Sequence, residues 1–192
     1  MQIINGFDLP VDQAFDLICG IYRACDAFAA TLKEIYPDPE TFARYLRELK
    51  QRPGAQFLVA QQDDVLTGFL FADPRPYQRM SHVADLRIGT LSSSIEHGIE
   101  PMLLSDALSR AWQEGQLEIL YLTVRTDDTS RIHHYEKAGF TRTAVLKKDL
   151  KIDGEYFDGF LMSVDLVQLS QKRSFASSLQ MGNRATLHPT SP

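Results

Sequence analysis

Residues 122–140 read LTVRTDDTSRIHHYEKAGF. The first part, through Arg125, continues a run of mainly apolar residues that begins at Leu117. Such a run predicts a strand that is buried on both faces. The second part has helical spacing over about 129–138 and ends at Gly139, a residue that suits a left-handed helix terminator. The sequence therefore predicts a central buried strand followed directly by a short helix.

The segments on either side predict the other elements. Apolar residues at helical spacing indicate two amphipathic helices, one from Val11 and one after Asp38-Pro39, a cap followed by a first-turn proline. Further along, we expect a hairpin over 56–60 and 66–71, a strand over 82–91, a helix over 101–114, and a hairpin over 142–152 and 155–166. Asp153-Gly154 is a strong turn signal for that last hairpin. A strand–helix–strand order between two hairpins predicts a mixed α/β sheet with one crossover at its middle.

Composition excludes several classes of protein. The 192 residues carry a net charge of −5, which disfavours a nucleic-acid partner. The apolar runs are far shorter than the roughly 20 residues of a membrane span, and the N-terminal residues lack the pattern of a secretory signal. Cys19 and Cys25 are typical of reduced thiols in a cytoplasmic protein. We expect one domain over 1–169 and a polar, weakly basic tail over 170–192; the tail and the last hairpin are candidate homodimer surfaces.

Residues 122–140 are similar to the hallmark of the GCN5-related N-acetyltransferase (GNAT) superfamily, which typically reads Leu-x-Val, a later Asn, an Ala, and Tyr-Glu-Lys-x-Gly-Phe. The segment Asp153-Gly154-Glu155-Tyr156-Phe157-Asp158 resembles the last hairpin of many members. With the element order, the resemblance covers about 56–166. It implies a mostly antiparallel sheet that is splayed at its centre and flanked by helices. It also implies an N-acyltransferase, most simply one that transfers acetyl from acetyl-CoA to a primary amine of a small molecule or peptide.

The resemblance implies a set of site residues as well. Tyr135 would be the general acid for the departing thiolate, and Asp85 the candidate base, with His82 and His134 as weaker alternatives. The residues implied for cofactor binding are Ile88, Gly89, Leu91, His97, Gly98, Ile99, Asp128, Arg131 and Tyr135. Tyr36 and Tyr77 are candidates for the acceptor pocket. The alternatives are that Tyr135 is a core aromatic residue, that Asp85 is a solvent-facing strand residue, and that Tyr36 and Tyr77 are ordinary packing residues.

We expect no metal site. His133 and His134 are adjacent, and neighbours on a helix diverge by about 100°, so they cannot share one ion.

Several positions depart from the family pattern. The family's cofactor loop, Gln/Arg-x-x-Gly-x-Gly/Ala, keeps only Gly98 here. Ile95 removes a donor, and Glu100 puts a carboxylate where a diphosphate would arrive. Asp128 replaces the usual Asn and adds negative charge, whereas Arg131 replaces a small Ala and either obstructs the cleft or restores positive charge. Two alternatives therefore stay open: a binding or regulatory module without CoA binding, and an acyltransferase with a carrier-protein donor.

Overall fold

The computed structural model describes residues 1–25, 28–91 and 98–171, and within these ranges seven strands form one sheet. The strands are β1 (Gln2–Asn5), β2 (Gln56–Gln62), β3 (Val65–Pro74), β4 (Val83–Thr90), β5 (Ile119–Arg125), β6 (Thr141–Ile152) and β7 (Glu155–Asp165). The helices are α1 (Val11–Ala24), α2 (Leu32–Ile35), α3 (Pro39–Lys50), α4 (Ile99–Glu114) and α5 (Thr129–Ala138), with 3₁₀ turns η1 (Gly6–Asp8) and η2 (Gln78–Met80). Residues 166–171 are also helical.

The sheet order is β1-β2-β3-β4-β5-β7-β6, and every neighbouring pair except one is antiparallel. The exception is the parallel pair β4 and β5, which the crossover helix α4 connects. This arrangement confirms the predicted mixed α/β fold with a mostly antiparallel sheet.

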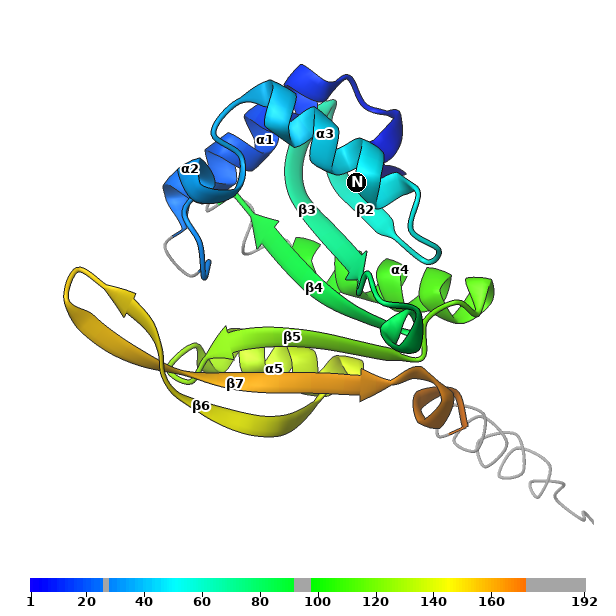
Figure 1. Cartoon of the computed structure of the whole chain (residues 1–192), viewed down its shortest axis with the longest axis vertical. Helices are drawn as coiled ribbons and strands as arrows, with labels where there is room; N and C mark the ends of the chain where they lie inside the picture. The colour runs from blue at the N-terminus through cyan, green and yellow to red at the C-terminus, as the bar shows by residue number, and fades with distance from the viewer. Residues whose placement is uncertain (26–27, 92–97, 172–192) are drawn as a thin grey trace, which may run out of the picture.

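The sheet opens at its middle. β4 and β5 pair only through residues 83–85 and 119–121, and beyond this short ladder the two strands diverge (Figure 1). The backbone groups of β4 after Asp85 that face away from β3 therefore have no partner on β5.

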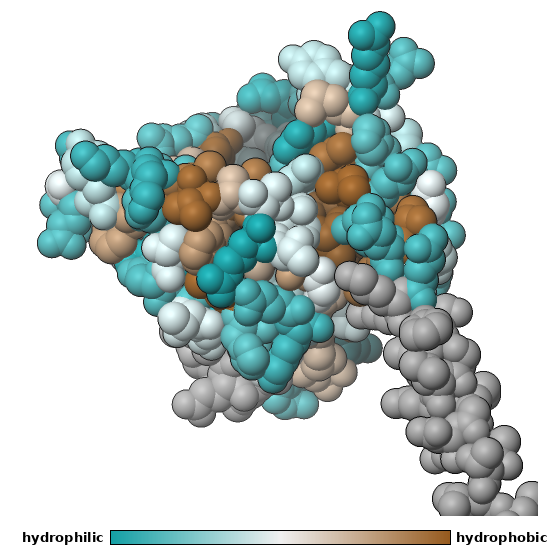
Figure 2. Space-filling view, turned by 90° about the horizontal axis from the view of Figure 1, so that it is seen from below, coloured by the Kyte–Doolittle hydropathy of each residue, from teal (hydrophilic) through white to brown (hydrophobic). Residues whose placement is uncertain are grey.

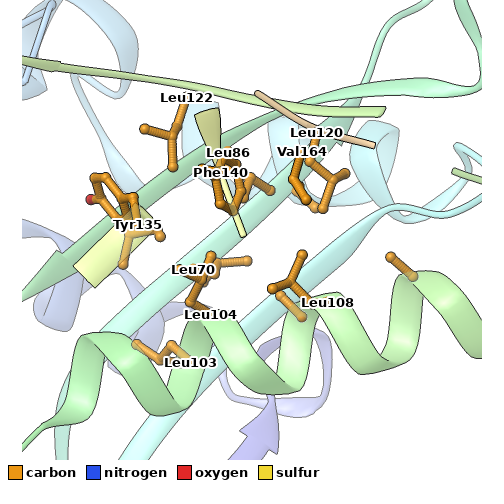
Figure 3. Close-up of a cluster of buried hydrophobic side chains, with 14 of the residues drawn as sticks. Leu70, Leu86, Leu103, Leu104, Leu108, Leu120, Leu122, Tyr135, Phe140 and Val164 are labelled. Atoms are coloured by element: carbon orange, nitrogen blue, oxygen red, sulfur yellow. The ribbon is translucent and has the colours of Figure 1, made fainter. Parts of the chain in front are cut away.

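Helices cover both faces of the sheet. α1 and α3 pack on β2 and β3 around Phe42, Phe57 and Phe71. On the other face, α4 and α5 enclose a cluster of leucines together with Phe140 and the ring of Tyr135 (Figure 3). Tyr135 thus projects from this core toward the middle of the sheet, where the strands separate.

Local sequence explains most of the helix boundaries. Asp38 caps α3 by accepting a hydrogen bond from the Thr41 amide at 2.7 Å, and Gly139 ends α5 with φ of 110°. Helix α4 begins at Ile99, two residues earlier than predicted, and its N-cap is Gly98, which adopts φ of 67°.

One prediction about the sheet is wrong. β5 is not buried on both faces: Leu120, Leu122 and Val124 are buried, and the residues between them alternate to the other face. On that side α1 and α3 pack on β2 and β3 rather than on β5, and Tyr121 and Thr123 line a cavity.

Figure 2 shows the molecule from below the view of Figure 1; this face is largely hydrophilic, with apolar groups among the polar ones. No helix in the described ranges combines the length and the apolar character needed to cross a membrane. The predicted tail lies mostly outside the described residues.

Candidate active site

A cavity of about 330 Å³ fills the opening between β4 and β5. Its polar wall residues include Asp85 and Arg87 from β4, Tyr121 from β5 and Tyr135 from α5. Apolar side chains form much of the remaining wall: Phe28, Ile35, Leu86, Ile88, Leu122, Val124 and Leu161. A concave, largely apolar pocket with a few converging polar groups is typical of a small-molecule site.

A second cavity, of about 460 Å³, lies at the N-terminal end of α4. Arg125, Asp128 and Arg131 line both cavities, so the two adjoin. The second cavity also receives the carboxylates of Glu100 and Asp127, so its wall carries charges of both signs.

Tyr135 is a buried phenol that Glu100 holds in place. Its hydroxyl donates to Oε1 of Glu100 at 2.5 Å, and Nε of Arg131 donates to Oε2 of the same carboxylate at 3.2 Å. Burial raises the pKa of Tyr135 well above its ordinary value, and the negative charge of Glu100 raises it further. Tyr135 therefore carries its proton at neutral pH.

Asp128 begins α5 and also contacts Arg131. Its Oδ1 accepts a hydrogen bond from the Arg131 amide at 3.0 Å, which caps the helix, and its Oδ2 lies 3.5 Å from Nη1 of Arg131. Arg131 thus lies between the carboxylates of Glu100 and Asp128. Burial opposes the charge on Arg131, but the neighbouring acidic groups together, Glu100 first among them, outweigh burial and raise the pKa of the guanidinium.

Asp85 lies in the last residue pair before β4 and β5 separate. Both its carboxylate oxygens accept hydrogen bonds from Arg75, each at 3.0 Å. Arg75 in turn lies over the ring of Tyr121, with 5.1 Å between its Cζ and the ring centroid. The sequence analysis identified Asp85 as a candidate but missed Arg75, because the two residues come together only when β3 and β4 pair.

Arg87 is a second polar wall residue that the sequence analysis missed. Its Nη2 donates to the hydroxyls of Tyr36, at 2.8 Å, and Tyr45, at 2.5 Å. Tyr36, a predicted acceptor residue, is buried and reaches the site through this contact. The available signal was a lone arginine inside an otherwise mainly apolar strand.

The other predicted site residues lie in varied surroundings. Ile88 lines the first cavity, and Leu91 packs against the core beneath α1. Gly89 is closely packed, since an added Cβ would lie 2.7 Å from Ile21. The Ile99 side chain is buried in the core, and a Cβ added at Gly98 would have no described neighbour within 4 Å.

Three further predictions concern Tyr77, Ile95 and His97. Tyr77 is 70% exposed and is not among the described residues that line the first cavity. Ile95 and His97 lie outside the described residues.

His133 and His134 have different surroundings, since His133 is exposed and His134 lines the second cavity. Within the described ranges, no three His, Cys, Asp or Glu side chains gather as a metal site would require.

The site fits an extended thioester donor. The unpaired backbone edge of β4 can pair with the amides of a pantetheine arm, as an added strand would. The two adjoining cavities give that arm a continuous path from Tyr135 to the first turn of α4, at Glu100 and Pro101. Arg125 and Arg131 lie where the two cavities adjoin, a place called the donor mouth below, and their positive charges can attract a diphosphate. The carboxylates of Glu100 and Asp128 oppose that attraction.

Comparisons with known proteins agree with this geometry. The family model "Acetyltransferase (GNAT) family" matches residues 21–140. A curated relative, "L-amino acid N-acetyltransferase AaaT" of Escherichia coli, is 29% identical over 143 residues, which cover 69% of this chain and 88% of that protein.

Solved structures show the same fold. A GNAT-family acetyltransferase from Streptococcus pneumoniae superposes with a TM-score of 0.75 at 22% identity, over 85% of this chain and 98% of that one. The putative acetyltransferase yncA from Salmonella typhimurium, solved with acetyl-CoA, gives 0.73 at 17% identity, over 86% and 94%.

The chain belongs to the acetyltransferase (GNAT) family, because the family model covers more than half of it. As a member of this family, the chain is an N-acetyltransferase.

Proposed function

We propose that the chain acetylates the primary amino group of a small molecule, and that amino acids are the first acceptors to test. The buried, protonated Tyr135 hydroxyl on the wall of the β4–β5 cavity carries this proposal. The cavity volume of about 330 Å³ is in the range of small-molecule sites. The name of the E. coli relative, an L-amino acid N-acetyltransferase, supports the same class of acceptor.

Tyr135 acts as the general acid in this proposal. Transfer requires a free amine that attacks the thioester carbonyl, and the departing thiolate must gain a proton. Tyr135 supplies that proton, and its hydroxyl must first turn from Glu100 to the sulfur because it has a single proton to donate. Unpaired backbone N–H groups on β4 would polarise the carbonyl that is attacked.

Asp85 is the proposed acceptor of the proton from the amine. Its carboxylate is held by Arg75, but each oxygen keeps a further lone pair for the amine or for a water molecule. Asp85 lines the same cavity as Tyr135, so both ends of the proton transfer belong to one pocket.

The test combines a binding measurement with an assay. We expect calorimetry of the full chain to detect acetyl-CoA binding, and CoA release to depend on an added amino acid. The Tyr135→Phe variant should lower kcat on the order of 10²-fold, with little change in the acetyl-CoA KM, because only the proton donor is removed.

Tyr156→Phe is the matched control, since Tyr156 is exposed on the β6–β7 hairpin and should keep full activity. If acetyl-CoA did not bind, the donor assignment would be wrong, and the result would favour the alternative of a binding or regulatory module without CoA binding. If Tyr135→Phe kept the kcat of the unaltered chain, Tyr135 would not be the general acid and would serve only as a core aromatic residue.

A further inference from the structure

Arg87 is a half-buried cation without an ion-pair partner in the part of the chain that the structure describes. Other arginines of the sheet and its helices pair with acidic side chains: Arg52 with Asp73, Arg75 with Asp85, Arg125 with Asp127, and Arg131 with Glu100. Among residues 1–25, 28–91 and 98–171, no Asp or Glu forms an ion pair with Arg87. A buried charge without a counter-charge is costly, so its retention calls for an explanation.

Neutral aromatic groups hold Arg87 in position. Both hydrogen bonds of its Nη2 go to phenol oxygens, and its Cζ lies 5.2 Å from the ring centroid of Tyr45 and 5.1 Å from that of Phe71. Burial raises the pKa values of Tyr36 and Tyr45, so both phenols stay uncharged. The tyrosines therefore orient the guanidinium without cancelling its charge.

Three of the five N–H donors of this guanidinium belong to Nε and Nη1. The hydrogen bonds to Tyr36 and Tyr45 both come from Nη2, and the guanidinium also interacts with the hydroxyl of Tyr22, a third phenol, which lines the first cavity. Arg87 lines the first cavity beside Asp85, which is two residues away on the same face of β4. The N–H groups of Nε and Nη1 thus adjoin the place where the amine is activated.

We propose that Arg87 binds the carboxylate of the acceptor, so that the acceptor is an amine that also carries a carboxylate group. This inference rests on the proposed function and specifies its substrate class. The apolar walls formed by Phe28, Ile35 and Leu86 suit an acceptor with an apolar side chain. A guanidinium is the group that best recognises a carboxylate.

The experiment compares ligands that differ only in the carboxylate. Calorimetry of the full chain with CoA present would measure binding of L-phenylalanine against 2-phenylethylamine, and of L-leucine against 3-methylbutylamine. We expect the amino acids to bind on the order of 10²-fold more tightly, with the same ratio in kcat/KM.

Arg87→Gln should remove most of this difference and leave the binding of the simple amines little changed, whereas Arg87→Lys should keep part of it. Arg110→Gln is the control, since Arg110 pairs with Asp106 on α4 away from the cavity. Thermal unfolding would check that each variant folds. If Arg87→Gln fails to fold, the ligand comparison on the unaltered chain still decides.

The inference is overturned if the unaltered chain binds amines and amino acids equally, if no carboxylate of the panel binds, or if Arg87→Gln weakens both ligand types alike. Equal turnover of both types would leave the proposed function standing and remove only this inference. Arg87-dependent binding of amino acids without any acetylation would support the inference and contradict the proposed function.

Discussion

Glu100 connects two residues that the proposed reaction uses. Its carboxylate accepts hydrogen bonds from Tyr135 and Arg131, and its side chain is only 11% exposed. The same negative charge stands where the donor's diphosphate must arrive, and it engages a cation that would attract the diphosphate. Donor binding therefore has to compete with Glu100 for Arg131.

Glu100→Gln should strengthen acetyl-CoA binding, with a Kd lower by on the order of tenfold, because one opposing charge is removed from a poorly solvated place. Calorimetry with Asp106→Asn as the control would measure this, since Asp106 is on the same helix but pairs with Arg110. Equal Kd values for the two variants would contradict this account of the donor mouth.

Glu100→Gln should also change the pH dependence of kcat. Burial is the main cause of the raised pKa of Tyr135, and the Glu100 charge adds to it. Without that charge the pKa of Tyr135 falls, so the phenol loses its proton at a lower pH. The alkaline decline of kcat should therefore begin at lower pH in Glu100→Gln than in the unaltered chain, as a pH–rate profile would measure.

The contacts of the candidate site could be predicted from the sequence only where they lie within one short segment; Asp85 was named from the family resemblance, but its contact with Arg75 was not predicted. Tyr135 and Asp128 belong to one helix and its cap, so a short motif identified both. Asp85 and Arg75 are brought together by strand pairing, and Arg87 meets Tyr36 and Tyr45 only after α3 packs on the sheet. These contacts depend on tertiary structure, which no local pattern encodes.

Helix α5 has a cap that is also part of the donor mouth. Asp128 accepts from the Arg131 amide and faces the Arg131 guanidinium. Asn caps a helix as well as Asp does, whereas Ala does not. Substitution at this position therefore separates the role of the cap from the role of the charge.

Asp128→Asn should leave the free energy of unfolding nearly unchanged, whereas Asp128→Ala should lower it by about 1 kcal/mol. Asp128→Asn should also bind acetyl-CoA more tightly, because it removes a negative charge. Denaturant unfolding and calorimetry of both variants would measure the two effects. If Asp128→Asn were as unstable as Asp128→Ala, the ion pair with Arg131 rather than the cap would stabilise the start of α5.

Elements with long periodic patterns were the predictable ones. Helices α1, α3 and α5 and the β6–β7 hairpin lie where the sequence predicted them. The four-residue elements β1 and α2 were missed because they are too short for a periodic pattern to develop.

The two parts of the sheet share few direct contacts at the centre of the molecule. β4 and β5 meet through three residue pairs. A ligand that lies between these two strands therefore joins the part of the sheet formed by β1–β4 to the part formed by β5–β7. Binding to the folded state alone stabilises it by mass action.

Acetyl-CoA at 100 times its Kd should add about 2.7 kcal/mol to the free energy of unfolding. For a chain of this size, that increase corresponds to a Tm higher by about 5–10 °C. Scanning calorimetry would measure the shift, and Tyr135→Phe should show the same rise because it affects transfer rather than donor binding. An unchanged Tm would indicate that the donor does not lie between the strands.

The two edges of the sheet also determine how the chain behaves in concentrated solution. An open edge strand is a template for pairing with other chains, and natural proteins protect such edges with charge, irregularity or shortness. β1 is only four residues long. β6 is longer, but its register is interrupted twice, Lys148 adopts φ of 53°, and Lys147 and Lys151 add charge. Both edges thus resist edge-to-edge aggregation, and any self-association of this chain should use side-chain surfaces rather than a continuous intermolecular sheet.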